Sequence, residues 1–99
     1  MNDITTDELK QRMDAGEKLN LFDVREPHEY EEYNIGATLI PLGELPGRIG
    51  ELTNLKEEEV IVHCRSGARS ANAKMFLLDN GFTNVRNVLG GMLDWQSKF

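Results

Sequence analysis

The stretch from Val60 to Ser70 reads V-I-V-H-C-R-S-G-A-R-S, and it constrains the fold more than any other part of the chain. An apolar, β-branched run ends at Cys64, the only cysteine. A short loop with one glycine and two arginines then leads into an apolar pattern with helical spacing. This order predicts a strand, a loop and a helix. A short loop that enters a helix turns backbone N–H groups inward and adds the positive end of the helix dipole. The stretch therefore predicts an anion-binding loop with Cys64 at its base.

A lone cysteine is more often a small buried hydrophobic residue than a nucleophile. The residues after Cys64 argue against that interpretation, because they supply positive charge, hydroxyl groups and backbone freedom instead of apolar contacts. Nearby cations and a helix N-terminus favour the thiolate, which is the reactive form of cysteine. We therefore interpret Cys64 as a reactive thiol whose anion the loop stabilises, and to which the arginines attract a second anion.

The rest of the chain alternates short apolar runs with helical patterns. This alternation is typical of a three-layer α/β/α domain with a central, mostly parallel sheet of about five short strands. Ligands of such sheets bind beyond the carboxyl ends of the strands, where we expect Cys64, Asp23 and Arg25. In the helix after the loop, Ala71, Met75 and Leu78 share one side of a wide apolar surface, so the helix is expected to be well buried. The expected helices are 6–15, 28–33, a broken helix over 43–55, 70–80 and a last turn around 92–95; the expected strands are 19–24, 37–42, 60–64 and 85–89, with a charged turn at 56–59.

Length and composition narrow the class of protein. The 99 residues predict a single domain, 1–99, with no room for a second module. One cysteine and two scattered histidines exclude an intramolecular disulfide and a zinc-type ligand cluster, and no metal or cofactor is expected. Without a signal-peptide pattern or a bilayer-length apolar run, a cytoplasmic location is expected. The net charge of −6 disfavours nucleic acid and anionic membranes as partners, so an anionic substrate must be attracted locally by the loop.

The motifs, taken together, resemble those of the rhodanese family of sulfurtransferases. The resemblance rests on D-V-R-E at 23–26 with the following P-H-E-Y, I-P-L at 40–42, C-R-S-G-A-R-S at 64–70, G-F-x-N-V at 81–85 and L-G-G-M-x-x-W at 89–95. It implies a three-layer α/β/α domain with a parallel sheet, in which Cys64 becomes a persulfide. The chain departs from the family between Tyr33 and Ala37, where it lacks the usual His and Pro and is one residue shorter. The resemblance therefore implies no substrate contact for this segment.

The expected reaction moves a sulfane sulfur from thiosulfate or another small anionic donor to cyanide or a thiol, through a Cys64 persulfide. If the loop lowered the pKa of Cys64 by about two units, the thiolate fraction at pH 7 would rise roughly 25-fold and its nucleophilicity would fall about 8-fold. The net gain would be only about threefold. The main contribution of the loop is then electrostatic, through attraction of the dianionic donor and stabilisation of the departing sulfite and of the persulfide. No general base is required, because both partners react as anions.

Individual roles follow from the residue types. Arg69 is the best candidate to bind the oxyanion of the donor, whereas Arg65 either shares this role or faces solvent. Gly67 lets the backbone approach the sulfur. Asp23 and Arg25 are interpreted as a buried pair that braces the loop. The substrate-binding residues expected from the loop are Arg65, Ser66, Gly67, Ala68, Arg69 and Ser70, with Ser70 either donating its hydroxyl or capping the next helix.

Three other functions fit parts of the pattern. A persulfide carrier for thiolation of tRNA or a cofactor would share the Cys64 intermediate and would need a sulfur-relay protein as partner. A cysteine phosphatase or arsenate reductase would use a related loop with five residues between Cys and Arg, whereas only four separate Cys64 from Arg69. A non-catalytic recognition module would not need the cysteine and both arginines together.

Overall fold

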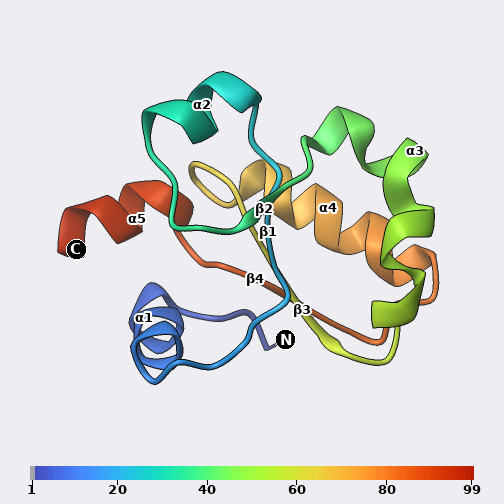
Figure 1. The fold of residues 1–99 in the computed structure, drawn as a ribbon, viewed down its shortest axis with the longest axis horizontal. Helices are drawn as coiled ribbons and strands as arrows, with labels where there is room; N and C mark the ends of the chain where they lie inside the picture. Colours follow the sequence, from blue (N-terminus) through green and yellow to red (C-terminus); the bar gives the residue numbers. More distant parts are fainter. Residues whose placement is uncertain (1) are drawn as a thin grey trace.

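A computed structural model describes residues 2–99 (Figure 1). Its centre is a parallel sheet with the strand order β2-β1-β3-β4. An isolated parallel bridge between Ile4 and Val88 adds one further residue pair, so the expectation of about five strands is approximately right. The strands are β1 (Leu21–Asp23), β2 (Thr38–Leu39), β3 (Glu59–His63) and β4 (Asn84–Asn87).

Helical segments cover both faces of the sheet, as an all-parallel sheet requires. Val60 and Val62 of β3 pack into one core with Leu77 of α4, whereas Ile61 packs into the other with Met92 of α5. This alternation of buried residues on β3 confirms the three-layer α/β/α architecture. The helical segments are α1 (Thr6–Asp14), α2 (Pro27–Glu32), the 3-10 helix η1 (Leu42–Glu44), α3 (Leu45–Arg48), the 3-10 helix η2 (Ile49–Leu55), α4 (Ala68–Asp79) and α5 (Gly91–Lys98).

Several predicted boundaries are wrong by a few residues. Glu59 belongs to β3 and not to the charged turn, because its backbone pairs with Asn84 across the sheet. The strand predicted over 37–42 is reduced to Thr38–Leu39, because the chain turns into η1 after Pro41. The helix expected from residue 70 begins at Ala68, which places its first turn directly beside Cys64. The broken helix over 43–55 corresponds to three consecutive short segments.

The expectation that α4 is well buried is only half right. Ala73 and Leu77 pack against the sheet, but Met75 and Leu78 are 58% and 37% exposed. A helix that lies on the outer face of a sheet can bury one side only, and here the apolar residues extend around to the other side. Within residues 2–99, no helix is long and apolar enough to cross a membrane.

Candidate active site

The loop between β3 and α4 places backbone donors around the Cys64 sulfur. The N–H of Gly67 is 3.1 Å from Sγ, and the N–H and hydroxyl of Ser70 are 3.4 Å and 3.3 Å from it. Gly67 is the N-cap of α4 and has a φ of 105°, which residues with a side chain rarely adopt, so glycine is needed for the chain to turn back towards the sulfur. Ser70 lies inside the first turn of α4 and is not its cap. The loop thus directs the start of a helix at the sulfur atom.

The environment of Cys64 favours its thiolate. The residue is buried, and burial by itself would raise the pKa of the thiol. Hydrogen bonds from the Ser70 hydroxyl and from the amides of Ser70, Gly67 and Ser66 outweigh burial and lower the pKa below its ordinary value. The group that this arrangement stabilises is therefore an anion on sulfur.

The N-terminus of α5 holds the other side of the loop. Met92 N–H donates to the carbonyl of Cys64 at 3.0 Å, and Leu93 N–H donates to that of Arg65 at 2.9 Å. A Cβ atom on Gly91 would lie only 2.5 Å from the Cys64 carbonyl oxygen, so this close approach requires glycine. In the sequence, Gly90 and Gly91 are recognisable only as part of the L-G-G-M-x-x-W motif. Their contact with the loop could not be found from spacing alone, because α5 is more than twenty residues away along the chain.

The guanidinium of Arg69 is engaged by Glu29 of α2. Nη1 and Nη2 lie 2.7 Å and 2.9 Å from the two carboxylate oxygens. The hydrogen bonds from Arg69, opposed by burial and aided by the Glu26 backbone, lower the pKa of Glu29 to about 2. The negative field of Cys64 also helps to raise the pKa of Arg69, after the larger effect of Glu29. The charge of Arg69 therefore interacts with that of the Cys64 sulfur while its guanidinium is paired with Glu29.

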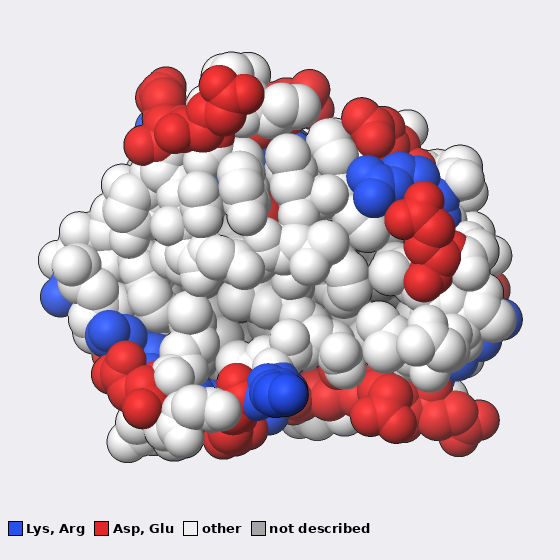
Figure 2. All heavy atoms as spheres, in the orientation of Figure 1, with Lys and Arg blue, Asp and Glu red and all other residues white. Residues whose placement is uncertain are grey.

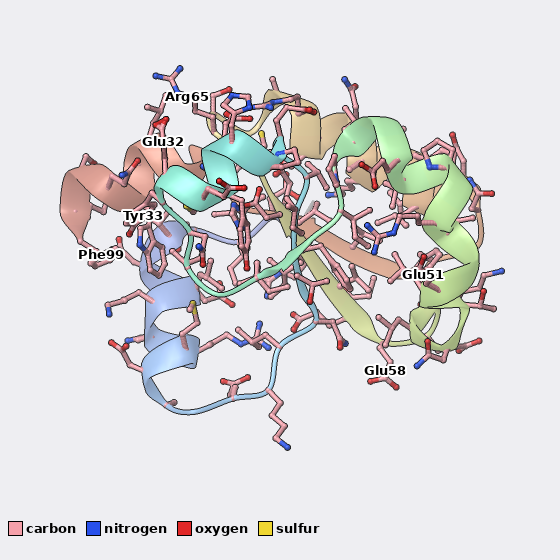
Figure 3. All side chains as sticks on the ribbon, turned by 45° about the horizontal axis from the view of Figure 1, so that its top comes forward. Glu32, Tyr33, Glu51, Glu58, Arg65 and Phe99 are labelled. Atoms are coloured by element: carbon pink, nitrogen blue, oxygen red, sulfur yellow. The ribbon has the colours of Figure 1, made fainter. Side chains whose placement is uncertain are left out.

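The other loop side chains face outward. Arg65 projects from the end of the molecule that also carries Glu32 of α2 (Figure 3). Ser66 and Ala68 are also exposed. Acidic side chains gather along the same end, over α2 (Figure 2). Beside the loop lies a pocket of about 150 Å³, lined by Arg25, Glu29, Glu32, Tyr33, Arg65, Met92 and Gln96.

Asp23 and Arg25 form a buried ion pair at the end of β1. Arg25 donates to both carboxylate oxygens of Asp23 at 2.7 to 3.0 Å, and its Nη2 also donates to the carbonyl of Tyr33 at 2.7 Å. His63 is fully buried next to this pair, and its two ring nitrogens have no hydrogen-bond partner among the described residues. Burial is the main cause that lowers the pKa of His63 to about 4. An uncharged His63 without a partner suits packing and not proton transfer.

The site includes a residue that no sequence pattern predicted, Asn87 at the end of β4. Its side chain accepts from the Ser70 hydroxyl at 2.5 Å and donates to the Gly67 carbonyl at 3.0 Å. The signal available in the sequence was weak: a polar residue within an apolar run one strand away from Cys64. Only the pairing of β3 with β4 brings Asn87 beneath the loop.

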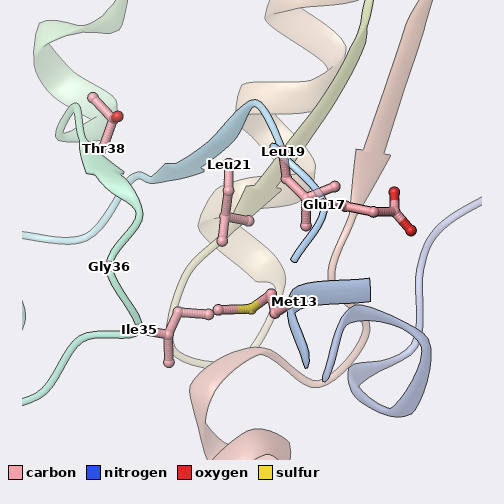
Figure 4. Close-up of a pocket in the computed structure, with 7 residues that line it drawn as sticks. All are labelled: Met13, Glu17, Leu19, Leu21, Ile35, Gly36 and Thr38. Carbon is pink, nitrogen blue, oxygen red and sulfur yellow. The ribbon is translucent and has the colours of Figure 1, made fainter. Parts of the chain in front are cut away.

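A second hollow, of about 240 Å³, is lined by residues that include Met13, Leu21 and Thr38 (Figure 4). Leu21 and Thr38, which line it, begin β1 and β2, so it is at the amino end of the parallel sheet. Cys64 follows the carboxyl end of β3. The hollow is therefore separate from the cysteine, although Ile35 and Gly36 of the segment that departs from the family pattern contribute to it.

Fold and site together define a class of protein: α/β/α domains with a cysteine in an anion-binding loop at the carboxyl end of a parallel sheet. Comparison with known proteins is more specific. Residues 5–98 match the model of the Rhodanese-like domain, and the chain belongs to the rhodanese-like family.

Relatives and a solved structure agree with this assignment. The chain is 42% identical over 97 residues to the putative sulfur carrier protein YrkF of Bacillus subtilis, but it spans only 51% of that protein. It is 39% identical to the putative sulfurtransferase YtwF of the same organism, covering 99% of the chain and 93% of YtwF. A crystal structure of a rhodanese-like domain protein from Staphylococcus aureus superposes with a TM-score of 0.85 at 35% identity, over 96% of this chain and 91% of that one. These similarities support sulfur transfer of the rhodanese type.

Proposed function

We propose that the protein is a sulfurtransferase in which Cys64 carries the sulfur as a persulfide, with thiosulfate or a similar small anion as donor and cyanide or a thiol as acceptor. The observation that carries the proposal is the set of donors at the sulfur: the Gly67 and Ser70 amides and the Ser70 hydroxyl, all within 3.4 Å of Sγ. Donors aimed at the nucleophile itself stabilise it before attack. They also stabilise the negative charge that returns to it when the acceptor leaves.

The two steps balance without a redox partner. In the first, the Cys64 thiolate attacks the outer sulfur of thiosulfate, the S–S bond of the donor breaks and sulfite departs with the electron pair. In the second, the acceptor attacks the outer sulfur of the persulfide, and the Cys64 thiolate is the leaving group. With cyanide as acceptor the product is thiocyanate. Because nucleophiles and leaving groups are anions throughout, the positive potential of the loop assists both steps.

Each loop residue has a proposed role. Arg69 binds the oxyanion of the donor after its ion pair with Glu29 has opened. Arg65 contacts the donor from the solvent side. Gly67 and Ser70 contribute the donors described above, and the exposed Ser66 and Ala68 form the rim of the loop. The Asp23–Arg25 pair braces the neighbouring strand end.

A second candidate shares the same intermediate. In a persulfide carrier, the acceptor would be a protein thiol of a sulfur relay instead of a small molecule. The observation that favours it is the similarity to YrkF, which is named as a sulfur carrier and is about twice as long as this chain. The acidic end around α2, next to the loop, would then select a partner with a basic surface.

The test is the mass of the intact protein after incubation with thiosulfate. We expect a gain of one sulfur atom, which is lost on addition of cyanide with formation of thiocyanate. The Cys64→Ser variant, which replaces only the sulfur by oxygen, should show no gain. An unchanged mass together with hydrolysis of an aryl phosphate would refute the proposal and favour a phosphatase. Retention of the added sulfur in cyanide but transfer to a protein thiol would favour the carrier.

A further inference from the structure

The hydroxyl of Ser70 lies between two acceptors but has only one proton to donate. Its Oγ is 3.3 Å from Cys64 Sγ and 2.5 Å from Asn87 Oδ1, and all three residues are buried. The Ser70 N–H points at the sulfur separately, at 3.4 Å. At any moment the hydroxyl can therefore donate to the amide oxygen or to the sulfur, but not to both.

The orientation of the Asn87 amide follows from its second contact. Its Nδ2 lies 3.0 Å from the Gly67 carbonyl oxygen. In the reversed orientation, two oxygens would face each other at that distance with no proton between them. The backbone of Asn87 is fixed at the end of β4, where its N–H donates to Asp3 Oδ1 at 3.0 Å. The amide oxygen thus faces Ser70, and it can only accept.

We propose that Asn87 is a positioning residue that holds the Ser70 hydroxyl while Cys64 is an uncharged thiol, and yields it when the sulfur becomes an anion. In the thiol state, Sγ–H donates to Ser70 Oγ, whose own proton goes to Asn87 Oδ1. Once the thiol proton has left to solvent, rotation about the Cβ–Oγ bond of Ser70 brings its proton to the sulfur. When a second sulfur is added, the charge moves to the outer atom and the hydroxyl returns to Asn87. The S–H bond breaks before the rotation, and the rotation itself exchanges one hydrogen bond for another without breaking a covalent bond.

This arrangement makes Asn87 a competitor of the thiolate for one hydrogen bond. Removing its oxygen should therefore lower the pKa of Cys64, because the hydroxyl no longer has to leave a partner. A purely supporting role predicts the opposite sign, since a loosened loop would align its donors less well and raise the pKa. The sign of the change thus separates the two roles. The charged and titratable groups around the site are Arg65, the Arg69–Glu29 pair, His63 beside the Asp23–Arg25 pair, and the Lys74–Asp3 pair behind Asn87. A substitution of Asn87 by leucine replaces none of them.

The first test is a cycle of variants in which the pKa of Cys64 is measured by thiolate absorbance and by the pH dependence of alkylation with iodoacetamide. Asn87→Leu keeps the shape of the side chain, and the Gly67 carbonyl retains its bond from the Ala71 N–H at 3.0 Å. We expect this variant to lower the pKa by about 0.5 to 1 unit, which corresponds to one net hydrogen bond. Ser70→Ala should raise it, and Asn87→Leu should have no effect in the Ser70→Ala background. An unchanged or raised pKa in Asn87→Leu, or the same shift in both backgrounds, would overturn the proposal.

The second test measures the unsubstituted protein and does not depend on the folding of the Asn87 and Ser70 variants. The side-chain carbonyl carbon of Asn87, followed by NMR against pH, should shift with the same midpoint as the ionisation of Cys64, and it should stay constant in Cys64→Ser. A chemical shift of this carbon that does not change when Cys64 ionises would also refute the proposed exchange of the Ser70 hydrogen bond. The inference deepens the proposed function and rests on it for its role in catalysis. Neither measurement requires sulfur transfer, however, so a failure here and a failure of the proposed function remain distinguishable.

Discussion

Replacement of Glu29 by glutamine should improve the use of thiosulfate. Arg69, which we propose as the oxyanion binder, donates to both oxygens of Glu29 at 2.7 Å and 2.9 Å, so a donor must compete with this carboxylate. Glu29→Gln removes the charge and keeps an oxygen that can accept from the Glu26 N–H, as Oε1 does now at 2.9 Å. The substitution therefore removes the charge that competes with the donor for Arg69 and leaves only a neutral amide oxygen, while α2 keeps its N-terminal hydrogen bond.

The size of the effect follows from the ion pair. The pKa of Glu29 is lowered to about 2 from an ordinary value of 4.5, mainly by Arg69 and to a smaller extent by the Glu26 backbone and Arg25, and the whole difference corresponds to about 3 kcal/mol. The Arg69 side chain is 35% exposed, so solvent screening reduces the interaction to about 1 to 2 kcal/mol. Without this competition from Glu29, the KM of the variant for thiosulfate should be about 5- to 30-fold lower than that of the parent.

The assay is the initial rate of thiocyanate formation as a function of thiosulfate concentration, at constant ionic strength. Glu31→Gln is the matched control, because it removes one charge from the same helix and Glu31 forms no ion pair within residues 2–99. We expect its KM to stay within about twofold of the parent, as is usual for an exposed charge. The reasoning is refuted if Glu29→Gln leaves the KM for thiosulfate unchanged or raises it, since Glu29 would then be an aid to Arg69 and not its competitor.

Three further predictions concern stability, measured by urea unfolding. Gly91→Ala should lower the free energy of unfolding by about 2 to 4 kcal/mol, because its Cβ would lie 2.5 Å from a loop carbonyl oxygen; a neutral result would contradict the close packing of α5 on the loop. Asp23→Asn should cost about 3 to 5 kcal/mol, because it leaves the Arg25 guanidinium buried without its counter-ion, and a loss below 1 kcal/mol would rule this out. His63 has a folded pKa of about 4, below its unfolded value of 6.5, so its contribution is complete above pH 6.5 and is lost as the pH falls towards 4, by up to about 3 kcal/mol. His63→Leu should remove this part of the pH dependence, and an equal slope in both proteins would exclude His63 as its source.

Local sequence was sufficient to predict the central part of the fold. The β-branched run before Cys64, the glycine at 67 and the apolar spacing after it each act within a few residues, and the structure contains the predicted strand, loop and helix. The parallel sheet also followed from the alternation of patterns. Boundaries were less certain, because η1 and the short β2 depend on how Pro41 turns the chain against its neighbours.

Contacts between distant segments were beyond the reach of sequence patterns. The partner of Arg69 lies 40 residues away on α2, and the acceptor for the Ser70 hydroxyl lies 17 residues away on β4. Glu29 belongs to the P-H-E-Y motif, but that motif does not indicate a bond to Arg69, and Asn87 lies in no motif. The exposure of Met75 and Leu78 on α4 could not be predicted for a related reason. An apolar pattern shows which residues could be buried, but it does not show which side of the helix packs against the sheet.

The two hydrogen bonds that the Met92 and Leu93 amides donate to the loop have a consequence for how the protein folds. Every residue of the stretch from Cys64 to Ser70 leaves the ribosome well before α5 does, yet the carbonyls of Cys64 and Arg65 find their donors only when α5 arrives. A chain cut after Gly90 would contain the whole stretch from Cys64 to Ser70, but it would lack the two α5 amides that donate to the carbonyls of this stretch. The hydrogen bonding of the loop backbone is therefore complete only after α5 has docked.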